Sequence, residues 1–256
     1  MPRRQSIAHL PEFSDYLLAL CMFLGATLYT SVGHAGASSY IALMALFGLP
    51  APVMRPTALV LNILVASFTS FRFARAGLFR WRTLWPVLLG AVPMAFVGGS
   101  IHLPGEYYRP LVGVVLLIAA VRLLWPTTFG RIEPPKDVPV LWGVLAGVGI
   151  GLLSGLTGTG GGIFLSPLLL FMGWSEPRTA SGVAAVFILC NSIAGLLGNV
   201  SSVGSLPPMI PLFAAAVLLG AVIGTALGIS RLPPTGILRA LGLVLVVAGV
   251  KLLGVY

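Results

Sequence analysis

Apolar stretches long enough to cross a lipid bilayer recur along nearly the whole chain, separated by short polar gaps. A membrane-spanning helix needs about 20 mostly apolar residues. Charged residues make up only 8% of the chain, against roughly 25% in a soluble domain. The sequence therefore predicts an all-α, multi-pass integral protein of the plasma (inner) membrane. We expect about ten membrane-embedded helical segments by this criterion, at 14–32, 36–49, 53–73, 83–103, 107–125, 138–156, 160–173, 179–199, 207–229 and 235–255.

The first apolar segment also has features of a signal peptide, because Arg3 and Arg4 precede it. However, its apolar run is long and the chain stays hydrophobic after it. We expect it to be retained as the first helix.

Two related stretches lie about half a chain apart, at 31–62 and 156–191. Each passes from a glycine-rich turn to a short apolar run, then through a Pro/Arg-containing loop into a helix with a polar start. An internal repeat of this kind predicts two related halves. We expect a first transmembrane repeat at 1–125, a polar cytoplasmic linker at 126–139 and a second repeat at 140–256.

The placement of arginines predicts how the halves are oriented. Loop 72–82 carries four arginines, whereas the corresponding loop 199–206 carries no charge. Positively charged loops stay in the cytoplasm, so matching loops are expected on opposite sides of the membrane. This requires inverted-topology repeats of five segments each. If the short segments 36–49 and 160–173 do not cross, each half has four crossings and the repeats are parallel.

A glycine-rich break stands at the start of each short segment, and we predict a broken or re-entrant helix in each repeat. Glycine releases the backbone from helical geometry, and a following helix N-terminus offers free N–H groups that bind anions. The alternative is a tight loop at the surface. The substrate-binding candidates are Gly33, His34, Gly36, Ser38 and Ser39 in the first break, and Thr157, Gly158, Thr159, Gly160, Gly161 and Gly162 in the second.

Polar residues on the helices that follow complete the predicted site: Thr57 and Asn62 in the first repeat, Ser181 and Asn191 in the second. They either donate hydrogen bonds to substrate oxygens or join helices to one another. His34 could also carry a proton for coupling, since histidine changes its charge near neutral pH. Glycines at four-residue spacing elsewhere, 143–155 and 220–228, predict close helix packing.

Several classes of function do not fit this sequence. The net charge of +9 comes from arginines in loops and not from a basic face on a soluble domain, so we expect no nucleic-acid binding. Ser154, in GLLSGL, lacks a nucleophile elbow, and there is no cluster of metal ligands. We therefore expect no enzyme, metal or cofactor. The acidic residues all lie at segment ends or in loops and not within an apolar core, which disfavours a proton or cation relay.

The two matching stretches, GHAGASSYIALMALFGLPAPVMRPTALVLN and GLLSGLTGTGGGIFLSPLLLFMGWSEPRTASGVAAVFILCNSIAGLLGN, resemble the TauE/SafE family of sulfite and sulfonate exporters. The resemblance covers nearly the whole chain. It implies a permease that exports sulfite, sulfoacetate or other organosulfonates, and alternating access is the mechanism we expect. His34 and Ala35 stand where the second half has Thr159 and Gly160, so the two breaks are unequal.

A passive anion channel and a non-transporting scaffold subunit remain alternative functions for this chain. The expected partners are a small anionic substrate and membrane lipid, with a homodimer left open. The sequence does not identify the anion or the coupling ion.

Overall fold

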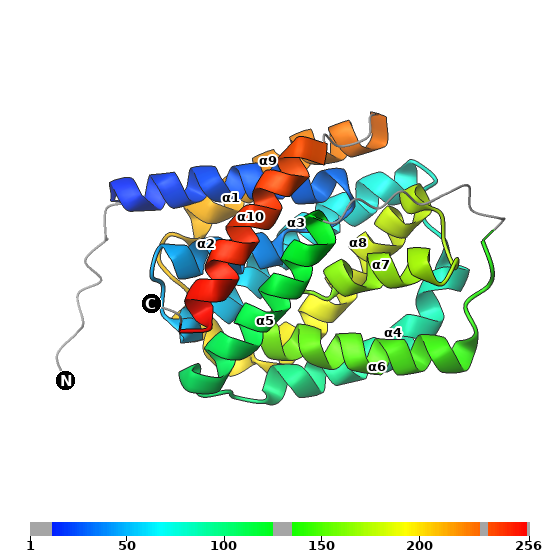
Figure 1. Cartoon of the computed structure of the whole chain (residues 1–256), viewed down its shortest axis with the longest axis horizontal. Helices are drawn as coiled ribbons and strands as arrows, with labels where there is room; N and C mark the ends of the chain where they lie inside the picture. The colour runs from blue at the N-terminus through cyan, green and yellow to red at the C-terminus, as the bar shows by residue number, and fades with distance from the viewer. Residues whose placement is uncertain (1–11, 125–134, 231–234, 255–256) are drawn as a thin grey trace.

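The computed structural model describes residues 12–124, 135–230 and 235–254, which form ten α-helices and one 3₁₀ helix (Figure 1). Each predicted segment coincides with one α-helix, and the all-helical class is confirmed. The elements are α1 (Phe13–Ser31), α2 (Ala37–Leu46), α3 (Ala51–Arg75), α4 (Trp81–Ser100), α5 (Gly105–Leu124), α6 (Val140–Thr157), α7 (Gly162–Phe171), α8 (Pro177–Gly198), η1 (Val200–Ser205), α9 (Ile210–Ser230) and α10 (Thr235–Leu252).

Six of the helices, α1, α3, α4, α6, α8 and α9, are long and apolar enough to cross a membrane, counting only described residues. Helices α2 and α7 have ten residues each and are therefore about 15 Å long. This is about half the thickness of a hydrocarbon core. Both short segments are thus helical over a smaller range than the sequence indicated.

Most of the predicted linker, 126–134, lies outside the described residues. The described part, 135–139, leads directly into α6. Its Lys136 N–H donates to the carbonyl of Gly173, after the end of α7, at 2.9 Å.

Two pairs of helices form opposite edges of the molecule: α1 packs along α9, and α4 packs along α6 (Figure 1). Each pair contains one member from each half of the chain. A Cβ on Gly147 of α6 would lie 2.1 Å from the carbonyl oxygen of Val87, and one on Gly224 of α9 would lie 2.1 Å from that of Thr27. The glycine rows therefore permit close backbone contact between halves, as predicted.

The interior is built around α3 and α8, the most buried of the six long apolar helices. They pack against one another, while α2 lies against α3 and α7 against α8. Each short helix thus packs against the long central helix that follows it in sequence. The glycine-rich breaks that precede α2 and α7 are thereby brought into the core.

Candidate functional site

The first break separates α1 from α2 at residues 32–36. Gly33 and Gly36 have φ values of 79° and 99°, which L-residues rarely adopt. Gly36 caps α2 from this left-handed conformation, and Gly33, Ala35 and Gly36 are buried. The break is therefore an internal loop packed in protein, the setting in which non-helical backbone is tolerated at membrane depth.

The second break, at 158–161, repeats this geometry between α6 and α7. Gly158, Gly160 and Gly161 have φ values of 81°, 76° and 75°, and all three are buried. Gly158 and Gly161 each lie 125 residues after their counterparts in the first break, Gly33 and Gly36. The repeat seen in sequence therefore extends to the backbone conformation of individual glycines.

Asn62 joins the two breaks near the middle of α3. Its side-chain oxygen accepts the N–H of Ala37, the first residue of α2, at 3.1 Å. Its amide nitrogen donates to Ser192 Oγ on α8, also at 3.1 Å. A Cβ added to Gly160 would lie 2.3 Å from this same nitrogen. Asn62 thus links its own helix α3 to the other central helix, α8, and also meets the end of the first break and Gly160 of the second. In this structure it acts as a helix-joining residue.

His34 connects the first break to α7. Its Nε2 lies 2.9 Å from the carbonyl oxygen of Gly162 and 3.3 Å from Ser166 Oγ. Its Nδ1 lies 3.1 Å from the carbonyl oxygen of Val32. The ring also meets Tyr29 edge-on, with centroids 6.2 Å apart. The histidine is therefore held between the two halves.

The other predicted side chains divide into two groups. Ser38 donates to the Tyr29 hydroxyl at 2.7 Å and Ser39 to the Gly36 carbonyl at 2.7 Å. Thr157 Oγ1 lies 2.9 Å from Thr159 Oγ1. These hydroxyls have partners within their own repeat, so they stabilise the breaks locally.

The second group consists of buried polar atoms without a hydrogen-bond partner among the described residues. It includes Thr57 Oγ1, Ser154 Oγ and both polar atoms of the Asn191 side chain. An unpaired buried polar group costs about 1–3 kcal/mol. Such groups mark places where water or a polar ligand would be stabilising. Ser181 differs, since it is only half-buried and donates to the Pro177 carbonyl at 3.1 Å.

Arg55 is the main residue that the site prediction missed. It is 6% exposed, and its guanidinium donates to the carbonyls of Gly98, Gly99 and Ile101 at 2.7, 2.6 and 3.0 Å. An ionisable residue within an apolar segment is a functional candidate by default. Arg55 lies inside the predicted segment 53–73, so this signal was present in the sequence.

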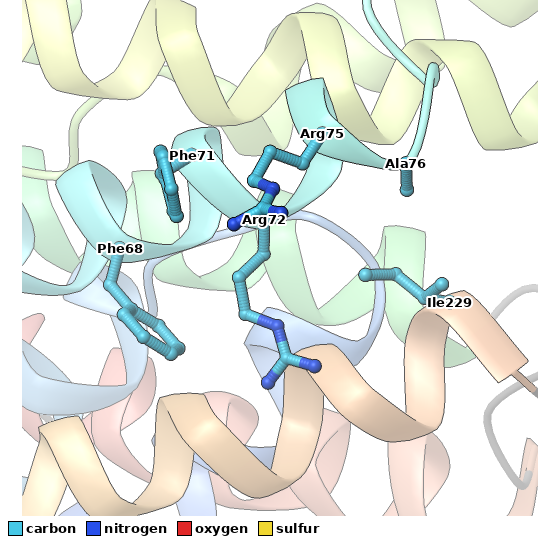
Figure 2. A pocket seen from close by; sticks show the side chains of 6 residues that line it. All are labelled: Phe68, Phe71, Arg72, Arg75, Ala76 and Ile229. Carbon is cyan, nitrogen blue, oxygen red and sulfur yellow. The ribbon is translucent and has the colours of Figure 1, made fainter.

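A second arginine-lined region lies at the other end of α3. A groove of about 500 Å³ is lined by Phe68, Phe71, Arg72, Arg75, Ala76 and Ile229. Figure 2 shows Arg72 extending from α3 toward α9, where its Nη1 donates to the Val222 carbonyl at 3.2 Å. Its guanidinium carbon lies 5.7 Å from the Phe68 ring centroid. Arg72 and Arg75 belong to the predicted positive loop 72–82, so this end of the helix bundle presents an arginine-rich surface.

The sequence is similar to those of known proteins along most of its length. The chain is 37% identical over 239 residues to "Probable membrane transporter protein y4hK" of Sinorhizobium fredii (strain NBRC 101917 / NGR234), a match that covers 92% of this chain and 97% of that protein. No solved structure matches the chain. The family described as "Sulfite exporter TauE/SafE" matches residues 18–252. The chain therefore belongs to the TauE/SafE family and is a multi-pass membrane transporter.

Proposed function

We propose that this transporter exports sulfur-containing anions, namely sulfite, sulfoacetate or other organosulfonates, across the plasma membrane by alternating access. The substrate would bind where the two glycine breaks meet, beside Asn62. The observation that carries the proposal is the reciprocal packing of the breaks against the central helices. The substrate class comes from the name of the matched family.

Each break packs against the beginning of the central helix from the other half. A Cβ on Gly33 would lie 2.2 Å from the backbone oxygen of Ser181, near the start of α8. A Cβ on Gly158 would lie 3.2 Å from the backbone oxygen of Arg55, near the start of α3. Both contacts place one half of the chain against the other in the same way. A pseudo-twofold relation between the repeats accounts for them.

The direction of the helices supports inverted repeats. In Figure 1, α1 runs from left to right along the upper edge, whereas α6, the first helix of the second half, runs from right to left along the lower edge. Helix α1 ends beside the start of α8, and α6 ends beside the start of α3. With loop 72–82 in the cytoplasm, α1 would end toward the cytoplasm and α6 toward the outside. The first break and α2 together would then carry the chain back across the membrane to the outer side, where α3 begins.

The junction suits an anion more than a cation. The N-termini of α2 and α7 both begin at the breaks, and a helix N-terminus carries a partial positive charge. The hydrogen bonds described above join Asn62 and His34 to uncharged groups of Ala37, Gly162, Ser166 and Ser192. A sulfonate or sulfite oxygen would compete with Asn62 Oδ1 for the N–H of Ala37. Binding and release of substrate would thereby be linked to a contact between the repeats.

Alternating access requires that the junction open to one side at a time. In this structure Gly160 and Asn62 are in close contact, and no space for a ligand separates them. Inverted-repeat transporters open by rocking one repeat or bundle against the other around a fixed site.

Export would be favoured by the membrane potential, since moving one negative charge outward gains about 2.3 kcal/mol per 100 mV. Coupling to protons through His34 is the other driving force we consider.

The test is flux of labelled sulfite and sulfoacetate in proteoliposomes. We expect saturable flux that depends on the imposed potential and that Asn62→Asp reduces strongly, because a carboxylate at this position repels the anion. Non-saturating current would favour a channel. Absence of flux for both anions, with correctly folded protein, would refute the sulfur-anion assignment.

A further inference from the structure

We propose that a second, separate site for a small oxyanion lies at the external end of the molecule, where Arg55 and Asn199 face one cavity. The cavity measures about 180 Å³ and lies between the start of α3, the α4–α5 connection and η1. Its polar lining consists of Arg55, His102, Tyr108, Asn199 and Ser202. Its position outside the glycine breaks makes it distinct from the substrate junction.

Within the described part of the chain, no carboxylate in this cavity balances the positive charge of Arg55. The three hydrogen bonds of Arg55 run to backbone carbonyls, and its Nε–H is buried without a partner among the described residues. None of the described residues that line the cavity is acidic. The Nη1 bond to Ile101 lies at the partly exposed edge of the guanidinium, so this edge is where a ligand would meet the charge. A guanidinium is well suited to oxyanions.

Asn199 supplies a neutral donor to the same cavity. The side chain is 2% exposed, and its Oδ1 accepts the Ser202 hydroxyl at 2.7 Å. That bond occupies the acceptor and leaves the amide N–H groups without a partner among the described residues. His102 fixes the neighbouring wall, since its ring nitrogens lie 3.0 Å from the Ser100 carbonyl and 3.3 Å from Ser201 Oγ. The α4–α5 connection and η1 are thereby held together around the cavity.

Two residues that line the cavity, Arg55 and Tyr108, also contact the backbone around the second glycine break. The Tyr108 hydroxyl donates to the Thr157 carbonyl at 3.1 Å, and Gly158 packs against Arg55. Arg55 and Tyr108 thus lie between the cavity and the start of the second break. An anion released outward from the junction would therefore meet Arg55 next. This role as an exit vestibule rests on the proposed function, whereas anion binding in the cavity does not.

The size of the cavity restricts its ligand. Sites for drug-sized molecules usually measure about 300–1,000 Å³. A cavity of about 180 Å³ suits an ion of a few heavy atoms, such as sulfite, and excludes a nucleotide. The chemical class that fits is a small oxyanion.

The test measures binding of radiolabelled sulfite to the purified full-length protein in detergent. Asn199→Asp keeps the size of the side chain and the acceptor for Ser202, but places a negative charge in the cavity. Ser202→Asp introduces the same charge from a partly exposed position. The matched control is Ser205→Asp, which adds this charge to an exposed position of η1 that does not line the cavity.

We expect saturable binding to the wild type, weakened about tenfold or more by Asn199→Asp and Ser202→Asp, because like charges in contact cost several kcal/mol. Ser205→Asp should stay within about twofold of the wild type, since an exposed charge is screened by solvent. Gel filtration of all four proteins establishes that they are folded. No saturable binding to the wild type, or unchanged binding to both cavity variants, would overturn the site.

Flux assays on the same proteins separate this proposal from the proposed function. If the wild type does not transport sulfite but shows the expected binding pattern, the oxyanion site stands and the export proposal fails. If both cavity variants bind and transport sulfite like the wild type, export stands and the second site is refuted.

Discussion

Asn62 Nδ2 donates a hydrogen bond to Ser192 Oγ at 3.1 Å, across the contact between the central helices α3 and α8. These helices belong to different halves of the chain, so a rocking motion between halves would stretch or break this bond. A neutral hydrogen bond contributes about 0.5–1.5 kcal/mol net. It therefore stabilises this arrangement of the two halves only modestly, and would not prevent the rocking that the proposed alternating access requires.

Replacing Asn62 with alanine should destabilise the protein. The change leaves the N–H of Ala37 and the hydroxyl of Ser192 without their partner in a buried position. We expect a loss of about 1–3 kcal/mol in unfolding free energy, measured by denaturant unfolding in detergent. Ser67→Ala is the control, since Ser67 is exposed on the same helix and bonds only to its own Ile63 carbonyl. Equal stability of the two variants would contradict the bridging role.

Gly160→Ala should abolish transport through a close contact. Its Cβ would lie 2.3 Å from Asn62 Nδ2 and 2.9 Å from Ile188 Cγ2. Gly173→Ala is the matched control, because Gly173 also has a positive φ, of 67°, but open space around it. Both variants carry backbone strain of about 1 kcal/mol or more. Only Gly160→Ala should lose flux in proteoliposomes, and equal loss in both would show that strain alone is responsible.

Two glycines of α6 should respond differently to alanine. A Cβ on Gly151 would lie 2.2 Å from the Ala91 carbonyl oxygen, whereas one on Gly149 would meet nothing within 4 Å. Gly151→Ala should lower the free energy of unfolding by about 1–3 kcal/mol, because the added methyl group overpacks the contact with α4. Gly149→Ala should be neutral or stabilise by up to about 1 kcal/mol, because alanine favours the helix. A destabilising Gly149→Ala would contradict the open space that surrounds this position.

The helices could be placed from the sequence because lipid imposes one requirement on every spanning segment, a long apolar run with internal backbone hydrogen bonds. The breaks could be placed because left-handed backbone favours glycine, and Gly33, Gly36, Gly158 and Gly161 all adopt it. Apolar length and glycine content are properties of local sequence. They predicted the elements and the loops between them.

The partners of individual side chains could not be predicted in this way. The sequence named Asn62 and Asn191 as candidate donors but gave no partner for either, and the structure places Ser192, the neighbour of Asn191, against Asn62. A shift of one residue rotates a helical side chain by about 100°, and helix packing decides which side chain reaches the interface. Arg55 lies within the predicted segment 53–73, but apolar patterning does not indicate which groups a side chain meets. Only the fold places the carbonyls of Gly98 and Gly99 around it.

His34 offers a direct test of proton coupling. Both of its ring nitrogens lie near carbonyl oxygens, Nδ1 by Val32 and Nε2 by Gly162. Carbonyl oxygens only accept hydrogen bonds, so both bonds form together only when the ring carries two protons and a positive charge. A neutral ring can make only one of these bonds, so protonation would add the second bond and loss of a proton would remove one of the two.

We expect His34→Gln to remove the response of transport to a proton gradient. Sulfoacetate is a suitable substrate because its charge is constant near neutral pH. Flux of labelled sulfoacetate would be measured in proteoliposomes with an imposed potential alone and with an added pH gradient. The variant should retain the flux that the potential drives, since its side chain can still donate to Gly162, but should lose the increase caused by the gradient. An unchanged increase would show that His34 only joins the two halves and that protons, if coupled, move through another group.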